Sequence, residues 1–97
     1  MKRAKRNWWG YAKSMVRRYP DNVNEDERKA VEAAIEKTKG LQNGEARMKV
    51  IELMYFKATH QMEGAAQSVH YSYDRVKTWH SDFIWEVGKN FNCKGLF

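Results

Sequence analysis

Polar and basic side chains gather in residues 72–81, where their types suit contact with a nucleic acid. Arginine and lysine donate hydrogen bonds to guanine edges or phosphates, and threonine and tyrosine contact thymine methyl groups or the backbone. Asp74 fits such a surface if it accepts from a cytosine amino group or pairs with Lys77. The candidates for base contact are Ser72, Tyr73, Asp74, Arg75, Lys77, Thr78 and Ser81.

A second group of basic residues lies at the N-terminus. The chain carries a formal net charge of +6, and residues 1–20 alone hold seven basic residues and no acidic one. The other 77 residues are therefore nearly neutral, and a polyanion should be attracted first to the N-terminal segment. The candidates for phosphate contact are Lys2, Arg3, Lys5, Arg6, Lys13, Arg17 and Arg18.

The aromatic residues of this segment allow two other interpretations. Trp8, Trp9 and Tyr11 beside lysine and arginine could form a helix lying in a membrane interface. Alternatively Trp8, Tyr11 and Met15 fill the core, since a chain of 97 residues needs large side chains at its centre. We favour the core for these aromatics and phosphate contact for the charges, because the apolar stripe is short and seven unopposed bases exceed what solubility requires.

Helices must position these groups. Ninety-seven residues make one domain, and no alternating apolar pattern of strand length occurs, so the chain is predicted to be an all-α bundle of about five helices. A basic helix or arm occupies residues 1–20 and ends at Pro20. Residues 24–58 are expected to form two helices that support the rest of the bundle. One lies at 25–39, with Asn24 and Glu27 as a capping box, and the other at about 45–58.

Residues 61–91 have the pattern of a helix-turn-helix. A short helix at about 62–70 is followed by a long helix at about 73–91, and Ala66 supplies the small side chain that a close crossing needs. Val69 and Tyr71 are expected beneath the turn, while Val76 and Trp79 seat the second helix on the first. Ser72 is the expected N-cap, and His70 stands where a turn often has glycine.

The order of these helices resembles the C-terminal promoter-reading region of bacterial sigma factors, known as region 4. The segments from Trp8 to Pro20 and from Val76 to Ile84 resemble small phage and prophage transcriptional regulators of the RinA and ArpU type. The resemblance covers most of the chain, but its specific motifs are confined to those two segments and the helix-turn-helix. It implies a phage or prophage regulator that activates late genes. The single cysteine, Cys93, is what we expect of a protein in the reducing cytoplasm of the bacterial host. The basic, tryptophan-rich N-terminus has no counterpart in sigma factors.

Other functions have little support in the sequence. Cys93 is the only cysteine, and His60, His70 and His80 are ten residues apart, a spacing that matches no metal site. His80 is expected to be a satisfied, partly buried core residue. No phosphate-binding loop or nucleophile motif occurs, so we expect no enzymatic activity, cofactor or metal, and no apolar run long enough to span a membrane is present.

Three functions remain to be compared. The first is a sequence-specific regulator that reads the major groove with the helix at 73–91, as a homodimer or with host RNA polymerase, because one module buries only about 600–1,000 Å² on double-stranded DNA. The second is a DNA packaging factor like a small terminase subunit. The third is a module that docks on RNA polymerase without DNA affinity of its own.

Overall fold

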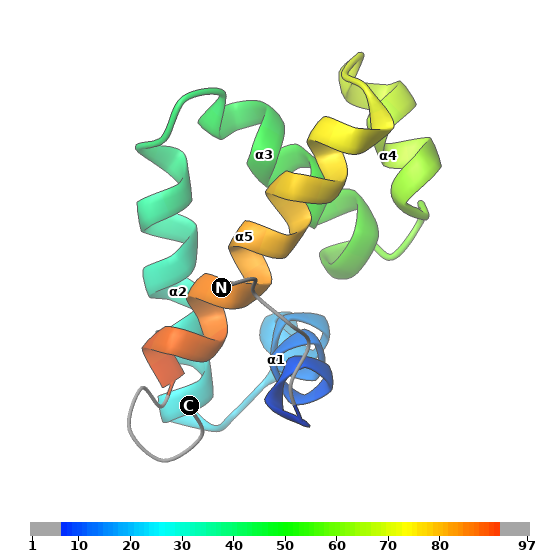
Figure 1. The fold of residues 1–97 in the computed structure, drawn as a ribbon. Helices are drawn as coiled ribbons and strands as arrows, with labels where there is room; N and C mark the ends of the chain where they lie inside the picture. Colours follow the sequence, from blue (N-terminus) through cyan, green and yellow to red (C-terminus); the bar gives the residue numbers. More distant parts are fainter. Residues whose placement is uncertain (1–6, 92–97) are drawn as a thin grey trace.

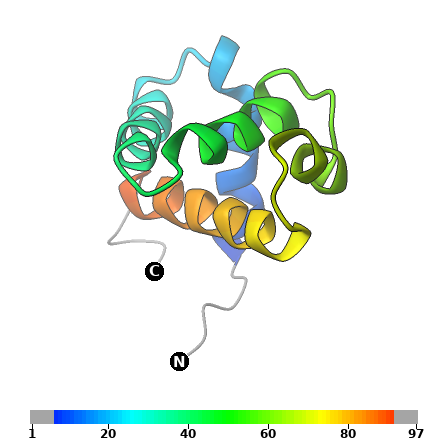
Figure 2. The same ribbon diagram turned by 90° about the horizontal axis from the view of Figure 1, so that it is seen from above.

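The structure is a computed structural model that describes residues 7–91. This part of the chain is all-helical, with five α-helices, as the sequence predicts. The longest of them, α5 (Tyr73–Phe91), packs against α1 (Asn7–Arg18), α2 (Glu25–Lys39), α3 (Gly44–Ile51) and α4 (Met62–Val69). Figure 1 shows α5 crossing the view diagonally from α4 toward the lower part of α2, and Figure 2 shows it running along one side of the bundle. No helix within residues 7–91 is both long and apolar enough to cross a lipid bilayer.

Helix α1 packs on the bundle through one apolar face. Trp8, Ala12, Met15 and Val16 are all buried, as expected for a core helix. Tyr11, which we assigned to the same stripe, is 37% exposed and uses its hydroxyl group in a polar network instead. After α1, the short 3₁₀ segment η1 (Tyr19–Asp21) contains Pro20 and turns the chain toward α2.

Helix α2 begins at the predicted residue, but its cap differs from a capping box. The Asn24 side chain accepts a hydrogen bond from the Glu27 backbone N–H at 3.0 Å. In a capping box the Asn24 N–H would in turn donate to the Glu27 side chain. Here the Asn24 N–H donates instead to Asn22 Oδ1 at 2.8 Å. The Glu27 carboxylate is therefore free to turn toward α1, and the capping-box prediction is correct for only one of its two bonds.

The helix predicted at 45–58 is shorter than expected. Helix α3 ends at Ile51 and continues as a π-helical segment, η2 (Glu52–Phe56), in which the Lys57 N–H bonds to the Glu52 carbonyl at 2.8 Å. The N–H groups of Thr59 and His60 then both bond to Leu53 O, which stops the helix. Ala58, the last residue of the predicted helix, is exposed with a φ of 54°. A π-helical turn is wider than an α-helical turn, so the residues after Ile51 no longer follow the apolar spacing of 3.6 residues. The helix therefore ends before residue 58.

The buried side chains form two clusters. The larger one joins α1, α2, the end of α3, η2 and the C-terminal half of α5, with Met15, Val31, Ile51, Ile84 and Val87 among its members. The smaller one lies between α3, η2, α4 and the first turns of α5. The first turns of α5 thus rest on their own apolar support, and the rest of α5 anchors them to the main core.

Candidate nucleic-acid interface

Helices α4 and α5 pack through Ala66, Val76 and Trp79, as predicted. Tyr71, expected beneath the turn, is instead 36% exposed. Ala66 is 4% exposed and lies in one cluster with Val76 and Trp79 of α5. Ala65, beside it, is fully buried. Val69 packs against the same cluster while remaining partly exposed. Small side chains on α4 therefore let α5 approach closely, as expected at a helix crossing.

The connection between the two helices is three residues long and is held by hydrogen bonds. His70 takes the left-handed conformation, with a φ of 65°, and its N–H bonds to Gln67 O. The Tyr71 N–H bonds back to Ala66 O at 3.2 Å. Ser72 then caps α5, since its Oγ accepts from the Arg75 N–H at 3.2 Å, which confirms the predicted cap. The direction of α5 is thus fixed at its first residue.

The first turns of α5 present their polar side chains to solvent. The base-contact candidates Tyr73, Lys77 and Thr78 are all exposed, and Tyr73 keeps 46% of its surface accessible. The other exposed candidates are Ser72, Asp74 and Arg75. Ser81, a turn further along, is half-buried. The structure therefore brings the seven candidates onto one end of one helix, with Ser81 at the edge of the accessible surface.

Local contacts restrain two of these side chains. Thr78 Oγ1 donates to the Asp74 carbonyl oxygen at 3.1 Å. The Arg75 guanidinium lies 6.0 Å from the centre of the Tyr71 ring. Neither contact uses up all the hydrogen-bonding capacity of the side chain, since a hydroxyl can still accept and a guanidinium has five N–H donors. Both groups can therefore still bind a ligand.

A second set of contacts ties Asn43 and the beginning of α3 to the α4–α5 turn and α5, and local sequence patterns do not predict it. The Arg47 guanidinium lies 5.5 Å from the centre of the Trp79 ring and 3.8 Å from an Asp82 carboxylate oxygen. The Tyr71 ring packs edge-on against Trp79 at 4.8 Å, and its hydroxyl donates to Asn43 Oδ1 at 3.2 Å. These contacts join residues up to 35 positions apart, so no helical periodicity reveals them.

His80 is buried behind the exposed face of α5, as expected for a core histidine. Its Nε2 shares a hydrogen bond of 2.6 Å with the Tyr55 hydroxyl, and the two rings stack with an interplanar angle of 4°. Burial raises the pKa of Tyr55 to about 12, although the nearby Arg17 opposes this shift. The phenol therefore stays protonated at neutral pH and links η2 to α5.

The structure divides the N-terminal phosphate candidates into two groups. Lys2, Arg3, Lys5 and Arg6 lie outside the described residues. Lys13 is half-buried on α1. Arg17 lies over the Tyr55 ring at 5.4 Å, and Arg18 forms an ion pair of 2.7 Å with Glu27. The two arginines at the end of α1 thus already stabilise the fold, which the charge pattern alone did not indicate.

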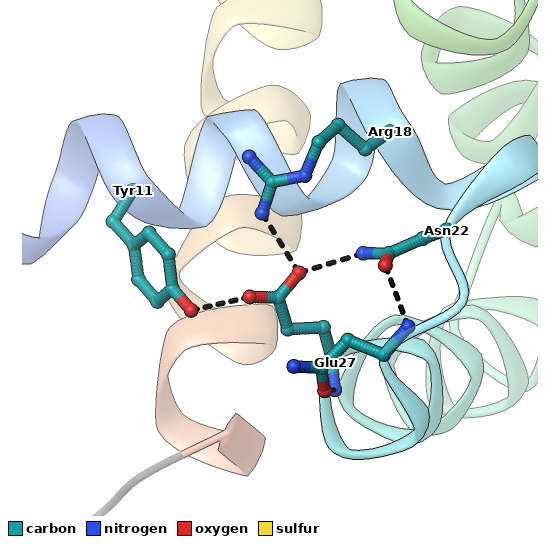
Figure 3. A network of polar contacts seen from close by, with 5 residues as sticks. Tyr11, Arg18, Asn22 and Glu27 are labelled. Carbon is teal, nitrogen blue, oxygen red and sulfur yellow. Dashed lines mark hydrogen bonds and ion pairs between the residues drawn. The ribbon is translucent and has the colours of Figure 1, made fainter.

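The partner of Arg18 is a buried carboxylate in a polar network (Figure 3). Glu27 is 6% exposed and accepts hydrogen bonds from Tyr11, Arg18 and Asn22. Burial alone would raise the pKa of Glu27, but the hydrogen bonds from these three donors outweigh it and the pKa is lowered. The same carboxylate and burial raise the pKa of Tyr11. This network joins α1 to α2 and has a structural role.

An apolar groove lies on another part of the surface. Its volume is about 630 Å³, and its lining comes from α2, α3 and η2, with Ile35, Met48 and Phe56 as its apolar side chains. None of the lining residues belongs to α4 or α5. Within residues 7–91, no three histidine, cysteine or acidic side chains are close enough together to hold a metal ion.

Comparison with known proteins gives no family assignment for this arrangement. No family model matches the chain, and no curated protein or solved structure is detectably similar to it.

Proposed function

We propose that the protein binds double-stranded DNA by placing the first turns of α5 in the major groove, as a transcriptional regulator of the phage type. The observation that carries this proposal is the exposed group Tyr73, Lys77 and Thr78 above the packed contact of Ala66 with α5. A short helix, a three-residue turn and a second helix with an exposed polar first turn are the parts of a DNA-reading helix-turn-helix. The resemblance to sigma region 4 and to RinA and ArpU regulators supports the same function.

The chemistry of this group suits base reading. Lys77 can donate to guanine O6 and N7, and the methyl group of Thr78 can contact a thymine methyl group. Ser72 and Tyr73, at the start of the helix, lie where hydroxyl groups of such motifs contact phosphates. One module of this size buries only about 600–1,000 Å² on DNA and binds weakly alone. A second copy of the chain or bound host RNA polymerase would supply the remaining affinity.

The test uses selection from a library of random 30-base-pair duplexes, followed by titration of the selected duplex at several salt concentrations. The expected result is a preference for the selected duplex over a scrambled one that persists across salt concentrations. Lys77→Ala and Thr78→Ala should each weaken that preference by about 1–3 kcal/mol, or about 5- to 150-fold. Lys57→Ala, an exposed lysine after η2, is the control and should leave the preference unchanged.

A second candidate function is favoured by the groove lined by Ile35, Met48 and Phe56. An apolar concave surface of this kind suits docking on another protein, such as RNA polymerase. A docking module without DNA affinity would show no preference between duplexes, and Met48→Lys would abolish its complex while Lys77→Ala would not. Light scattering distinguishes the packaging alternative, because a packaging factor of the small-terminase kind forms a ring of many copies.

A further inference from the structure

The side chain of Arg75 lies over an aromatic ring and keeps its hydrogen-bond donors unused. Its guanidinium is 6.0 Å from the centre of the Tyr71 ring, and Arg75 is exposed. Within residues 7–91 this guanidinium forms no hydrogen bond and no ion pair. By contrast, the arginines at positions 18, 28 and 47 each form an ion pair. A cation–π contact consumes none of the five N–H donors, so Arg75 keeps all of them for a ligand.

Tyr71, which lies beneath Arg75, is held in place from two sides. Its ring packs edge-on against Trp79 at 4.8 Å, and its hydroxyl donates to Asn43 Oδ1 at 3.2 Å. Trp79 is only 5% exposed, and the Arg47 guanidinium covers it at 5.5 Å from the ring centre. The support of Arg75 therefore comes from the α4–α5 turn, α5 and the beginning of α3. An arginine restrained on such a support loses less conformational entropy on binding than one that moves freely.

Arg75 begins the side of α5 that faces α2 and α3. Spacings of three or four residues put it in line with three residues further along the helix, namely Trp79, Asp82 and Glu86. Asp82 lies 3.8 Å from Arg47 of α3, and Glu86 lies 3.4 Å from Lys37 of α2. Figure 1 shows α3 beside the first turns of α5 on the side toward α2. Arg75 therefore projects from the flank of α5 next to α3.

A helix in the major groove meets bases and backbone with different sides. An α-helix with its side chains is about 10–12 Å in diameter, and the groove is about 12 Å wide. The helix therefore fills the groove, and side chains on its flanks lie against the sugar-phosphate walls. Residues two positions apart do not share a face, so Arg75 and Lys77 project from different sides of α5. The flank that carries Arg75 is the one that meets the wall nearest to α3.

The charges along this flank suit an anion at Arg75. The acidic residues further along it already have basic partners, which lie 3.4 and 3.8 Å away. Asp74 directly precedes Arg75, but adjacent residues of a helix do not face each other. A guanidinium binds a phosphate through two parallel N–H donors, a geometry that an exposed arginine over an aromatic ring can offer.

We propose that Arg75 binds a phosphate of the DNA backbone on the wall of the major groove nearest to α3, and that Tyr71 is the residue that positions it. The proposal rests on the function proposed above and changes the role of one of its seven candidates. Arg75 contributes affinity for any duplex, whereas Lys77 and Thr78 contribute the preference for one duplex over another.

A pair of arginine variants tests the phosphate contact. Arg75→Gln removes the charge and most of the donors, and Arg28→Gln removes the same charge from an exposed arginine of α2. Arg28 lies near the far end of α5, where the Asn90 side chain donates to Ala30 O at 3.4 Å. Circular dichroism verifies that both proteins are folded, and each is titrated with the selected and the scrambled duplex at several salt concentrations.

Arg75→Gln should weaken binding to both duplexes about tenfold at 50 mM salt and leave the preference between them unchanged within about twofold. It should also lower the magnitude of the slope of log K against log salt by about 0.9, because one phosphate is no longer neutralised. Between 50 and 200 mM salt, its affinity should therefore fall about 3- to 4-fold less than that of the unmodified protein. Arg28→Gln should change the slope by less than about 0.3.

Three other results would overturn the phosphate contact. A loss confined to the selected duplex would make Arg75 a base-reading residue. Equal slope changes in the two variants would mean that only net charge matters, and an unaltered slope in Arg75→Gln would remove the phosphate contact alone. Absence of duplex binding by the unmodified protein would remove the proposed function and the phosphate contact together.

The positioning role of Tyr71 is tested by a double-mutant cycle. Tyr71→Leu removes the ring beneath Arg75 and should weaken binding to both duplexes about 2- to 5-fold. In a protein that already carries Arg75→Gln, the same substitution should have almost no further effect, because the two residues act as one unit. Tyr71→Phe keeps the ring and should retain the affinity within about twofold. Equal losses from Tyr71→Leu with and without Arg75 would overturn the positioning role, since Tyr71 would then only support the fold.

Discussion

At the scale of single residues, Glu27 shows how one charge can connect two helices. Its carboxylate is the common acceptor for Tyr11 and Arg18 of α1 and for Asn22 of the α1–α2 connection. Removing the carboxylate would take away an acceptor that these three donors share. The fold therefore depends on the ionised form of Glu27.

Stability should accordingly depend on pH through Glu27. The folded protein holds the pKa of Glu27 below its ordinary value of 4.5, so the unfolded chain binds the proton more tightly. The stabilisation is present above about pH 4.5 and is lost as the pH falls through the folded pKa. Glu27→Gln should cost about 1–3 kcal/mol at pH 7 and less at pH 3.5, as measured by urea unfolding.

Glu32→Gln is the matched control, because Glu32 is 45% exposed and its hydrogen bonds to Tyr19 and Arg28 are at 3.2 and 3.3 Å. It should cost less than about 1 kcal/mol at either pH. A cost of Glu27→Gln that is the same at pH 7 and pH 3.5 would contradict the assigned role of the charge.

His70 gives a second prediction at this scale. A left-handed conformation costs a residue with a Cβ about 1–2 kcal/mol, and glycine avoids this cost at the expense of about 0.5–1 kcal/mol of chain entropy. His70→Gly should therefore stabilise the protein by about 0.5–1 kcal/mol in thermal or urea unfolding. Ser68→Gly, two residues earlier on an exposed face of α4, should instead destabilise it by about 0.5 kcal/mol. Equal effects of the two substitutions would argue against the left-handed turn.

At the scale of elements, the crossing of α1 and α5 depends on one glycine. Gly88→Ala places a methyl group in the Trp8 ring, so helix α1 must shift, and this should cost about 1–3 kcal/mol. Gly10→Ala is the control within α1, because no atom lies within 4 Å of the added Cβ, and it should stabilise the protein by about 0.5–1 kcal/mol. Urea unfolding of both variants measures the difference, and stabilisation by Gly88→Ala would contradict the close crossing.

The elements also show which features the sequence could predict. The bounds of α1, α2 and α5 follow from local signals such as Pro20, Asn24 and Ser72, whose effects reach only a few residues along the chain. The π-helical segment η2 does not follow from local signals, because the apolar spacing of 3.6 residues assumes a regular α-helix.

The candidate site likewise has some features that follow from the local sequence and others that do not. The exposure of Lys77 and Thr78 follows from their positions away from Val76 and Trp79 on one helix. The contacts of Arg47 with Trp79 and of Arg18 with Glu27 join different elements, and only the folded chain brings them together. Charge counting therefore assigned Arg18 to phosphate contact without revealing its ion pair.

At the scale of the whole molecule, the two halves of α5 have different surroundings. Its C-terminal half is embedded in the larger core through Ile84 and Val87, and its first turns project Tyr73 and Lys77 from the smaller cluster. A rigid core at one end can hold the exposed end in a fixed direction, which a reading helix needs. The apolar groove lined by Ile35 and Met48 remains available to a protein partner.

The most direct test of DNA reading by α5 is a nitrogen-15 NMR titration of the full chain with the selected duplex and with a scrambled one. Amide signals of residues 72–81 should shift most with the selected duplex and much less with the scrambled one at the same salt concentration. Signals around Ile35, Met48 and Phe56 should remain in place. Shifts confined to that groove, with residues 72–81 unmoved by either duplex, would contradict the proposed function.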